Sequence, residues 1–449
     1  MSGWLLNVAY AAALVATAPV WALRMLRHGK YRRDWPQRLG RSPRRYGLQP
    51  VIWIHGVSVG EVAAARALVD EIHAQLPDYR VVVSATTDTG LAAAQRLFAP
   101  DHTVFRWPWD FTFSVRAALD RVRPDVVILM EGDVWPNFLA ACRRRDVAVI
   151  VVNGRLGPHK GYPRYRLIRP LAARLFNGVT AIGVQHPAYA DLFRALGVRN
   201  DRLHVTGMMK FDTADLGDRV EGQDALAAAV GIAASDRLIV AGGTGRGEEA
   251  IILDAFAALR RRPEFEDLCL AIVPRKPERF DQVARLIGSR GLGMVRRSQR
   301  PDGTPGPVPP GAVILGDTMG DLRKFYALAT AVFVGRSLVP EGGSDMIEAA
   351  ALAKPVCFGY ETFNFPQAES MVAAGCAVRV ADAGQLAETL AGWLADPNAA
   401  AALGAKARQF VRDQQGATRR NVELICRALG RVPAPAPGAI ATDVIAEEA

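Results

Sequence analysis

Two kinds of segment alternate along most of the chain. Short runs of β-branched and other apolar residues are each followed by a longer stretch, rich in Ala, Leu and Arg, whose apolar positions recur with the period of a helix. This alternation is typical of βαβ units, in which helices cover both faces of a parallel sheet. In the first half we predict strands at residues 51–55, 80–85, 103–106, 125–130, 148–153 and 181–184. In the second half we predict them at residues 237–242, 269–273, 294–296, 312–315, 331–335, 355–358 and 377–380.

A segment without periodic apolar residues separates the two series of strands. Residues 206–223 are rich in Gly, Asp and Thr, and we place an interdomain linker at 208–223. The length of 449 residues also exceeds what one core usually holds. The predicted fold is therefore α/β, with two Rossmann-like domains, at 51–207 and 224–430, facing across a cleft in which ligands of such sheets bind. The Pro- and Ala-rich tail at 431–449 is predicted to be disordered.

The chain begins with an apolar segment. Residues 4–23 form a run of 20 mostly apolar residues, about the length that crosses a bilayer as a helix. We therefore predict a membrane anchor at 1–23. Three residues within it, Asn7, Thr17 and Pro19, weaken a spanning helix. A helix that lies in the membrane interface is the alternative, and it keeps the body of the protein on the same side.

A basic juxtamembrane segment follows at 24–50. It holds nine Lys or Arg residues against the single acid Asp34, which accounts for eight of the ten net positive charges of the chain. Because the remainder is nearly neutral, the charge indicates an anionic membrane as partner and no nucleic acid. Positive charge after the apolar segment, with none before it, distinguishes an uncleaved anchor from a signal peptide and predicts that the body faces the cytoplasm.

A glycine-containing segment with one acidic residue, Glu61, follows the first predicted strand. Gly56 and Gly60 are expected to let the backbone turn tightly and come close to a ligand. Glu61 then stands in the first turn of the next helix, beside Ser58, where a general base would stand. An acid that is merely favoured by the helix dipole is an equally good interpretation of this motif alone.

Two further strand ends in the first half carry polar residues. Glu131 follows the strand at 125–130 and has the aromatic side chain of Trp135 nearby, although acids also make ordinary turns. Asn153 and Arg155 end the next strand and precede a basic run that is suited to the phosphates of an anionic lipid. A solvated basic face is the competing interpretation.

The densest cluster of candidate residues lies in the second half. Gly342 and Gly343 precede a predicted apolar helix at 349–353, where free backbone N–H groups can hold a phosphate. Glu348 stands about one turn further and is placed to accept hydrogen bonds from ribose hydroxyls. Two other strand ends converge on the same place, so we predict a nucleotide-sized site there. Its further members are Arg275, Met319, Gly320, Ser337 and Ser344.

Cysteines and histidines do not form a recognisable site. The five cysteines are odd in number and widely spaced, which indicates a reducing compartment and no disulfide framework. No metal-ligand spacing appears. We predict that His55, His186 and His204 are structural residues.

At these residues the chain resembles the 3-deoxy-manno-octulosonic acid (Kdo) transferases of lipopolysaccharide assembly. Many separate motifs in one order make the resemblance specific, and they cover nearly the whole chain. They lie at residues 29–32, 38–40, 55–61, 84–90, 135–137, 206–212, 274–279, 316–320, 337–343, 348 and 359–365.

The resemblance implies a fold of the GT-B type and an inverting transfer of Kdo from CMP-Kdo to a lipid A precursor, without a metal or other cofactor. It implies an enzyme at the inner membrane, with an amphiphilic acceptor that explains the anchor. Glu61 would be the base, and Ser58, Gly60, Glu131, Asn153 and Arg155 would contact the acceptor. The donor would be held by Arg275, Met319, Gly320, Ser337, Gly342, Gly343, Ser344 and Glu348.

The chain also departs from the family pattern. The family usually has His-Asn-Pro after the paired glycines, where this chain has Ser344, Asp345 and Met346. The alternatives are a GT-B enzyme with another nucleotide sugar or acceptor, a nucleotide-sugar epimerase, and an inactive membrane-bound paralogue that binds lipid or sugar nucleotide. The membrane anchor argues against an epimerase, and the retention of Glu61 argues against a mere binding protein.

Overall fold

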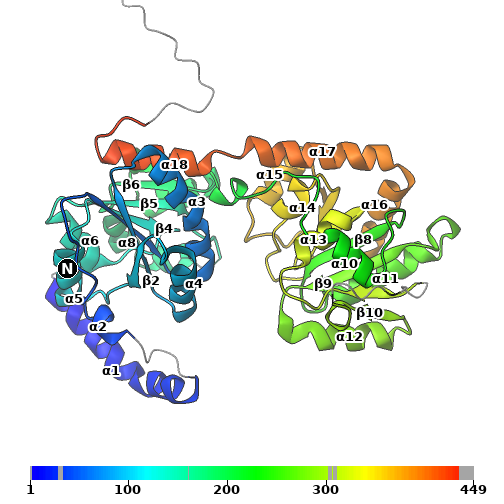
Figure 1. Ribbon diagram of the computed structural model, residues 1–449, viewed down its shortest axis with the longest axis horizontal. Helices are drawn as coiled ribbons and strands as arrows, with labels where there is room; N and C mark the ends of the chain where they lie inside the picture. Colours follow the sequence, from blue (N-terminus) through cyan, green and yellow to red (C-terminus); the bar gives the residue numbers. More distant parts are fainter. Residues whose placement is uncertain (1–2, 29–33, 160, 302–305, 307–310, 434–449) are drawn as a thin grey trace, which may run out of the picture. The chain divides into compact units, whose positions relative to one another are not determined.

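The computed structural model describes residues 3–28, 34–159, 161–301, 306 and 311–433, without the side chains of Arg24 and His28. These residues form two compact units (Figure 1). The first unit contains the chain up to Met209 and returns at Gly416, and the second unit is Lys210–Gln415. The division between Met209 and Lys210 lies inside the predicted linker. Most of the predicted disordered tail, from residue 434 on, lies outside the described residues.

A seven-stranded parallel sheet organises the first unit. Its strands lie in the order β3-β2-β1-β4-β5-β6-β7. The order reverses between β1 and β4, and the carboxyl ends of two such strands form the switch point where ligands of open α/β sheets bind. The strands are β1 (Val51–Gly56), β2 (Arg80–Ala85), β3 (Thr103–Arg106), β4 (Val126–Met130), β5 (Ala148–Gly154), β6 (Ala181–Val184) and β7 (Leu203–Val205).

Helices cover both faces of this sheet. Ile54 and Val83 pack on one face with residues of α3, α4 and α18, and Trp53 and Phe105 pack on the other with residues of α5, α6, α8 and α9. Strands buried on both faces are apolar along their whole length, which is why their sequences are continuous apolar runs. The helices are α1 (Gly3–His28), α2 (Trp35–Arg38), α3 (Val59–Gln75), α4 (Asp88–Phe98), α5 (Thr112–Val122), α6 (Pro136–Arg143), α7 (Gly161–Leu167), α8 (Arg169–Phe176), α9 (Pro187–Leu196) and α18 (Ala417–Ala428).

The second unit is built on the same plan. Its parallel sheet has the order β10-β11-β9-β8-β12-β13-β14, and its switch point lies between β8 and β12. The strands are β8 (Leu238–Thr244), β9 (Cys269–Pro274), β10 (Met294–Arg296), β11 (Val313–Leu315), β12 (Ala331–Val334), β13 (Val356–Phe358) and β14 (Val378–Arg379). The helices are α10 (Gln223–Val230), α11 (Glu248–Arg260), α12 (Phe280–Ser289), α13 (Leu322–Leu328), α14 (Ile347–Ala351), α15 (Gln367–Ala373), α16 (Ala383–Ala395) and α17 (Pro397–Asp413).

The two-domain α/β prediction is confirmed. Each predicted strand is present, with its ends within two residues of the prediction. The pattern does not predict β7, because three residues that include His204 are too few and too polar to stand out from a loop. The helix predicted at 349–353 has the predicted length but begins two residues earlier, at Ile347–Ala351.

The predicted end of the second domain, at residue 430, is wrong. Helix α18 belongs to the first unit, where Val422, Ile425 and Cys426 are fully buried in the core that also contains α3. An amphipathic helix shows in its sequence which face is buried but not which sheet buries it. The chain therefore crosses into the second unit at residue 210 and back at residue 416.

Helix α1 is the one helix in the described part of the chain that is long and apolar enough to cross a membrane. It contains Pro19, and none of the residues in its apolar window is buried. Length and composition alone do not decide whether it spans.

We expect Ile425→Ala to destabilise the first unit by about 2–5 kcal/mol, because it removes buried methyl and methylene groups from a core that cannot close around the gap. Denaturant unfolding followed by tryptophan fluorescence measures this, since Trp53 and Trp107 are buried in the same unit. The exposed Arg427→Ala on the same helix is the control and should be nearly neutral. Equal effects of the two substitutions would contradict the placement of α18.

Candidate active site

Glu61 lies at the switch point of the first sheet. It stands in the first turn of α3, directly after β1, and is 9% exposed. Its Oε2 accepts a hydrogen bond from the Val57 N–H at 2.8 Å, and its Oε1 accepts one from the Ser58 hydroxyl at 2.8 Å. Ser58 in turn is the N-cap of α3, and its hydroxyl oxygen accepts the Glu61 N–H at 3.4 Å. The structural interpretation of Glu61 therefore holds, because Ser58 and Glu61 form a variant of the capping box.

The pKa of the Glu61 carboxyl lies near neutral pH. Burial raises the pKa of its carboxyl to about 7, the hydrogen bonds from Val57 and Ser58 oppose the rise, and the charges of Glu131 and Asp133 add to it. A carboxyl group with this pKa is a carboxylate in a large part of the molecules at neutral pH and is a stronger base than an ordinary carboxylate. Capping and proton transfer are compatible roles for the same side chain.

Residues from two neighbouring strands lie close to Glu61. Glu131 follows β4 with a φ of 59°, and its carbonyl oxygen accepts the N–H of Arg155, which follows β5, at 3.0 Å. Burial raises the pKa of Glu131, and the guanidinium of Arg155 opposes the rise. Arg155 itself is exposed. The charge of Glu131 therefore interacts with both Glu61 and Arg155.

Three other predicted residues of this half have different roles. Asn153 is buried, and its Oδ1 accepts the Met209 N–H at 3.1 Å while its carbonyl accepts the Gln185 side chain at 2.9 Å. The chain passes from β1 to α3 in two residues, so the expected tight turn is present, without a positive φ at Gly56 or Gly60. Gly60 is an exposed helical residue, and a Cβ there would have only the Ser58 hydroxyl nearby, at 4.0 Å.

His55 is a structural residue, as predicted. Its ring stacks on Trp107 with 3.9 Å between the ring centroids, and its Nδ1 lies 3.0 Å from the Ser84 hydroxyl. Complete burial lowers the pKa of His55 to about 3, so the ring is neutral at physiological pH. It supports the loop before Glu61 without contributing charge.

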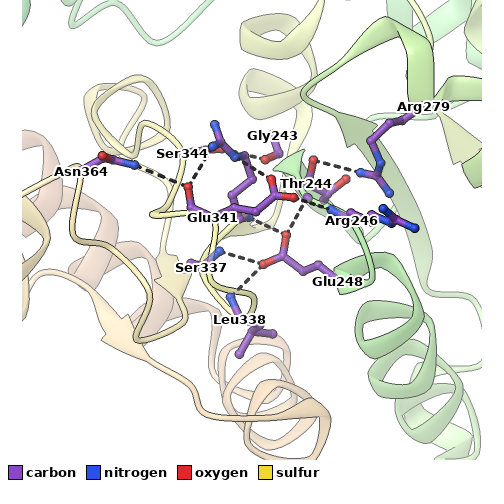
Figure 2. A network of polar contacts seen from close by, with 12 residues as sticks. Gly243, Thr244, Arg246, Glu248, Arg279, Ser337, Leu338, Glu341, Ser344 and Asn364 are labelled. Carbon is purple, nitrogen blue, oxygen red and sulfur yellow. Dashed lines mark hydrogen bonds and ion pairs between the residues drawn. The ribbon is translucent and has the colours of Figure 1, made fainter. Parts of the chain in front are cut away.

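In the second unit, the Glu248 carboxylate accepts hydrogen bonds from the backbone after both strands of the switch point, β8 and β12. It is fully buried in the first turn of α11, after β8, and Figure 2 shows its carboxylate pointing at the backbone after β12. It accepts the N–H groups of Gly245 at 3.0 Å, Ser337 at 2.9 Å and Leu338 at 2.9 Å, and also that of Arg336. Glu248 is not among the residues predicted from the sequence, where its signal is a glutamate just behind a glycine-rich strand end.

The paired glycines shape a loop after β12. Gly342 and Gly343 both have positive φ, of 84° and 85°, and a Cβ on Gly342 would lie 2.0 Å from the Asn364 amide nitrogen. Ser344 is buried, and its hydroxyl donates to the Gly243 carbonyl at 2.7 Å. The helix that follows, α14, has five residues and begins at Ile347.

Ser337 makes hydrogen bonds within the second unit. It is 1% exposed, its hydroxyl donates to the Val334 carbonyl at 2.6 Å, and its oxygen accepts the Gly359 N–H at 2.8 Å. Ser337 and Ser344 therefore hold backbone in place, and their hydroxyl protons are used inside the unit. Met319 and Gly320, in contrast, are exposed after β11, and Gly320 has a φ of 94°.

A basic cavity of about 350 Å³ opens where β8 and β9 end. Arg246 and Arg275 are exposed, and neither guanidinium forms a hydrogen bond or ion pair within the described part of the chain. Arg279 is instead paired with Glu249 at 2.6 and 2.8 Å. The other residues around the cavity are Thr244, Gly245, Lys276, Glu278, Gln282 and Glu341. The positive charge suits an anionic ligand, and Arg246 and Thr244 are members that sequence reasoning missed.

Glu348 lies in a mixed cluster of charges beside this cavity. Burial raises the pKa of Glu348, Asp345 adds to the rise, and Lys210 and Arg275 oppose it. The Lys210 ammonium pairs with the Asp345 carboxylate, whose other oxygen accepts the Ile347 N–H at 2.9 Å. Asp345 therefore gives the Lys210 ammonium an anionic partner within the protein.

Comparison with known proteins places this arrangement in a family. Residues 33–213 match the family model described as 3-deoxy-D-manno-octulosonic-acid transferase (kdotransferase). The 3-deoxy-D-manno-octulosonic acid transferase of Bordetella pertussis is 34% identical over 440 residues, which covers 94% of this chain and 99% of that protein. The chain belongs to the Kdo transferase family. The Haemophilus influenzae transferase is 32% identical over 317 residues, covering 70% of this chain and 72% of that protein.

Solved structures share the fold of this Kdo transferase at low sequence identity. A glycosyltransferase from Rickettsia africae has a TM-score of 0.60 at 13% identity, covering 85% of this chain and 99% of that chain. A UDP-N-acetylglucosamine 2-epimerase has a TM-score of 0.57 at 17% identity, covering 88% of this chain and 100% of that chain. The predicted GT-B type of fold is confirmed, and the chain is a glycosyltransferase by its family.

We expect Glu248→Gln to destabilise the second unit by about 3 kcal/mol or more, because an amide has one acceptor oxygen and brings an NH2 group against backbone donors. Differential scanning calorimetry of the full chain measures the loss. The exposed Glu266→Gln is the control and should change stability by less than about 0.5 kcal/mol. If Glu248→Gln left the stability unchanged, the four N–H groups would need no common acceptor.

Proposed function

We propose that this Kdo transferase moves Kdo from CMP-Kdo to a hydroxyl group of an anionic lipid A precursor. Membership of the family supports the reaction class. The observation that carries the proposal for the chemistry is the buried Glu61 carboxylate, whose pKa of about 7 suits a base at the switch point of the first sheet.

Glu61 would act as the general base. Its carboxylate takes the proton of the acceptor hydroxyl, the acceptor oxygen forms a bond to the anomeric carbon of Kdo, and the bond from that carbon to the phosphate oxygen breaks. CMP leaves with the electron pair, and attack from the opposite face inverts the configuration. Of the predicted acceptor residues, Arg155 and Gly60 are exposed near Glu61, and we propose that Arg155 contacts an acceptor phosphate.

The donor would bind in the second unit. CMP-Kdo carries two anionic groups, the phosphate and the carboxylate of the sugar, and the cavity offers the guanidinium groups of Arg246 and Arg275. Glu341, which lines the cavity, directly precedes the loop of Gly342 and Gly343. Because these side chains can balance the charge of the leaving group, we propose that transfer needs no metal.

The enzyme would work at the inner membrane with its body on the cytoplasmic side. The apolar helix α1 and the basic segment behind it support attachment to an anionic leaflet. Enzyme and lipid acceptor would then meet on the same surface.

We expect Glu61→Gln to lower the transfer rate by about 10²–10⁴-fold, because the amide cannot accept a proton. The assay incubates detergent-solubilised protein with CMP-Kdo and a tetraacylated lipid A precursor and follows the mass increase of the lipid. The amide oxygen can still accept the Val57 N–H, so the melting temperature should change little. If the wild-type protein released CMP without a lipid product, the proposed acceptor would be wrong. If it did not bind CMP-Kdo, the proposed donor would be wrong.

The transfer rate should rise with pH through about 7 and reach a plateau above it, since only the carboxylate form of Glu61 accepts a proton. Below pH 7 the rate should fall about tenfold per pH unit. A profile of kcat against pH between about 5 and 9 measures this. A flat profile across that range would contradict the role of Glu61 as base.

A further inference from the structure

Helix α1 contacts the first unit through one of its faces, beside the start of α5 (Figure 1). The Asn7 amide donates to the Thr112 hydroxyl at 2.7 Å and accepts the Thr112 N–H at 3.1 Å. The Tyr10 hydroxyl donates to the Asp110 carboxylate at 3.0 Å. A Cβ added to Gly3 would lie 2.8 Å from the Thr112 methyl carbon. Positions 3, 7 and 10 share one helical face, so the first turns of α1 are docked.

The chain returns to the same unit directly after α1. The Arg106 guanidinium, at the end of edge strand β3, donates to the Asp34 carboxylate at 2.9 Å, and the Arg106 N–H donates to the Gln37 side chain at 2.7 Å. Trp35 packs edge to face on Trp109 with 5.1 Å between the ring centroids. Helix α2 is therefore attached to the first unit as well.

These two attachments limit where the ends of α1 can lie relative to a membrane. From His28 to Asp34 the chain takes six residue steps, which reach at most about 20 Å when fully extended. The hydrocarbon core of a bilayer is about 30 Å thick. If α1 crossed it, the chain would have to recross 30 Å within those six steps to reach Asp34. Both ends of α1 must therefore lie on the side of the first unit.

We propose that α1 does not span the membrane but lies in the plane of its surface, docked on the first unit, and that its partner is an anionic lipid surface. The inference takes membrane attachment from the proposed function and adds the orientation of the helix. At about 100° per residue, the exposed apolar side chains of α1 project away from the docked face. They are Trp4, Leu5, Val8, Val15, Val20, Leu23 and Leu26.

Charge complementarity identifies the kind of surface. Arg27 is exposed at the end of α1, and Lys30, Arg32 and Arg33 follow in the sequence. A helix with an apolar outer face and a cluster of cations at one end binds where acyl chains meet anionic headgroups. This orientation also explains Asn7, which is costly inside a span but pairs with Thr112 in a docked helix.

The first test is the sidedness of the N-terminus. Full-length Ser2→Cys protein is added to preformed phosphatidylethanolamine–phosphatidylglycerol vesicles, floated, and treated with a membrane-impermeant maleimide. Ser289→Cys, at an exposed position of the body, is the control, and wild-type protein gives the background of the five native cysteines. We expect both engineered cysteines to be labelled without detergent. Labelling of Ser289→Cys with Ser2→Cys protected until detergent is added would overturn the proposal.

The second test asks whether docking persists on the membrane. The pair Gly3→Cys with Thr112→Cys should form a disulfide on oxidation, both in detergent and on vesicles. The pair Ala9→Cys with Thr112→Cys should not, because Ala9 is exposed on another face. A cross-link that is lost on vesicles, or that never forms, would contradict docking. Protein that does not float with the vesicles at all would instead contradict the membrane attachment of the proposed function.

Discussion

A parallel strand must be followed by a connection that carries the chain back to the starting edge of the sheet, so all strands of a parallel sheet end along one edge. In both units this brings loops far apart in sequence side by side where the strand order reverses. In the first unit the loops after β1, β4 and β5 bring together Glu61, Glu131 and Arg155. In the second, the loops after β8 and β12 meet at Glu248. The candidate chemistry of each unit depends on this constraint.

Glu61 and Glu248 show how the surroundings divide one residue type between two tasks. Each stands in the first turn of the helix that follows the strand at the switch point. Glu248 is fully buried and accepts four backbone N–H groups, so its carboxylate is committed to holding two loops together. Glu61 accepts one N–H and one hydroxyl, and burial together with its acidic neighbours raises its pKa to about 7. The two carboxylates therefore differ in the number of donors that they accept and in their burial.

The N-terminal helix shows that polar residues in an apolar segment carry information about its partner. Hydropathy alone treats Asn7 as a flaw in a membrane span. The contacts with Thr112 and Asn137 show that it is an attachment point, with the Asn137 amide donating to Asn7 at 3.2 Å. Asp110 holds Tyr10 on one side and accepts the N–H groups of Asn137 and Phe138 on the other. Docking of α1 and capping of α6 therefore share one carboxylate.

The sequence by itself determined the two parallel sheets, the strand that carries Glu61 to the switch point, and the family, because buried strands leave continuous apolar runs and the motifs keep their order. Only the tertiary structure decided that α18 belongs to the first unit and that Ser337, Ser344 and Asn153 hydrogen-bond to backbone groups. A loop serine that hydrogen-bonds to backbone and one that binds a ligand look the same in the sequence. What separates them is whether a backbone group lies within hydrogen-bond distance, and that depends on how distant segments pack.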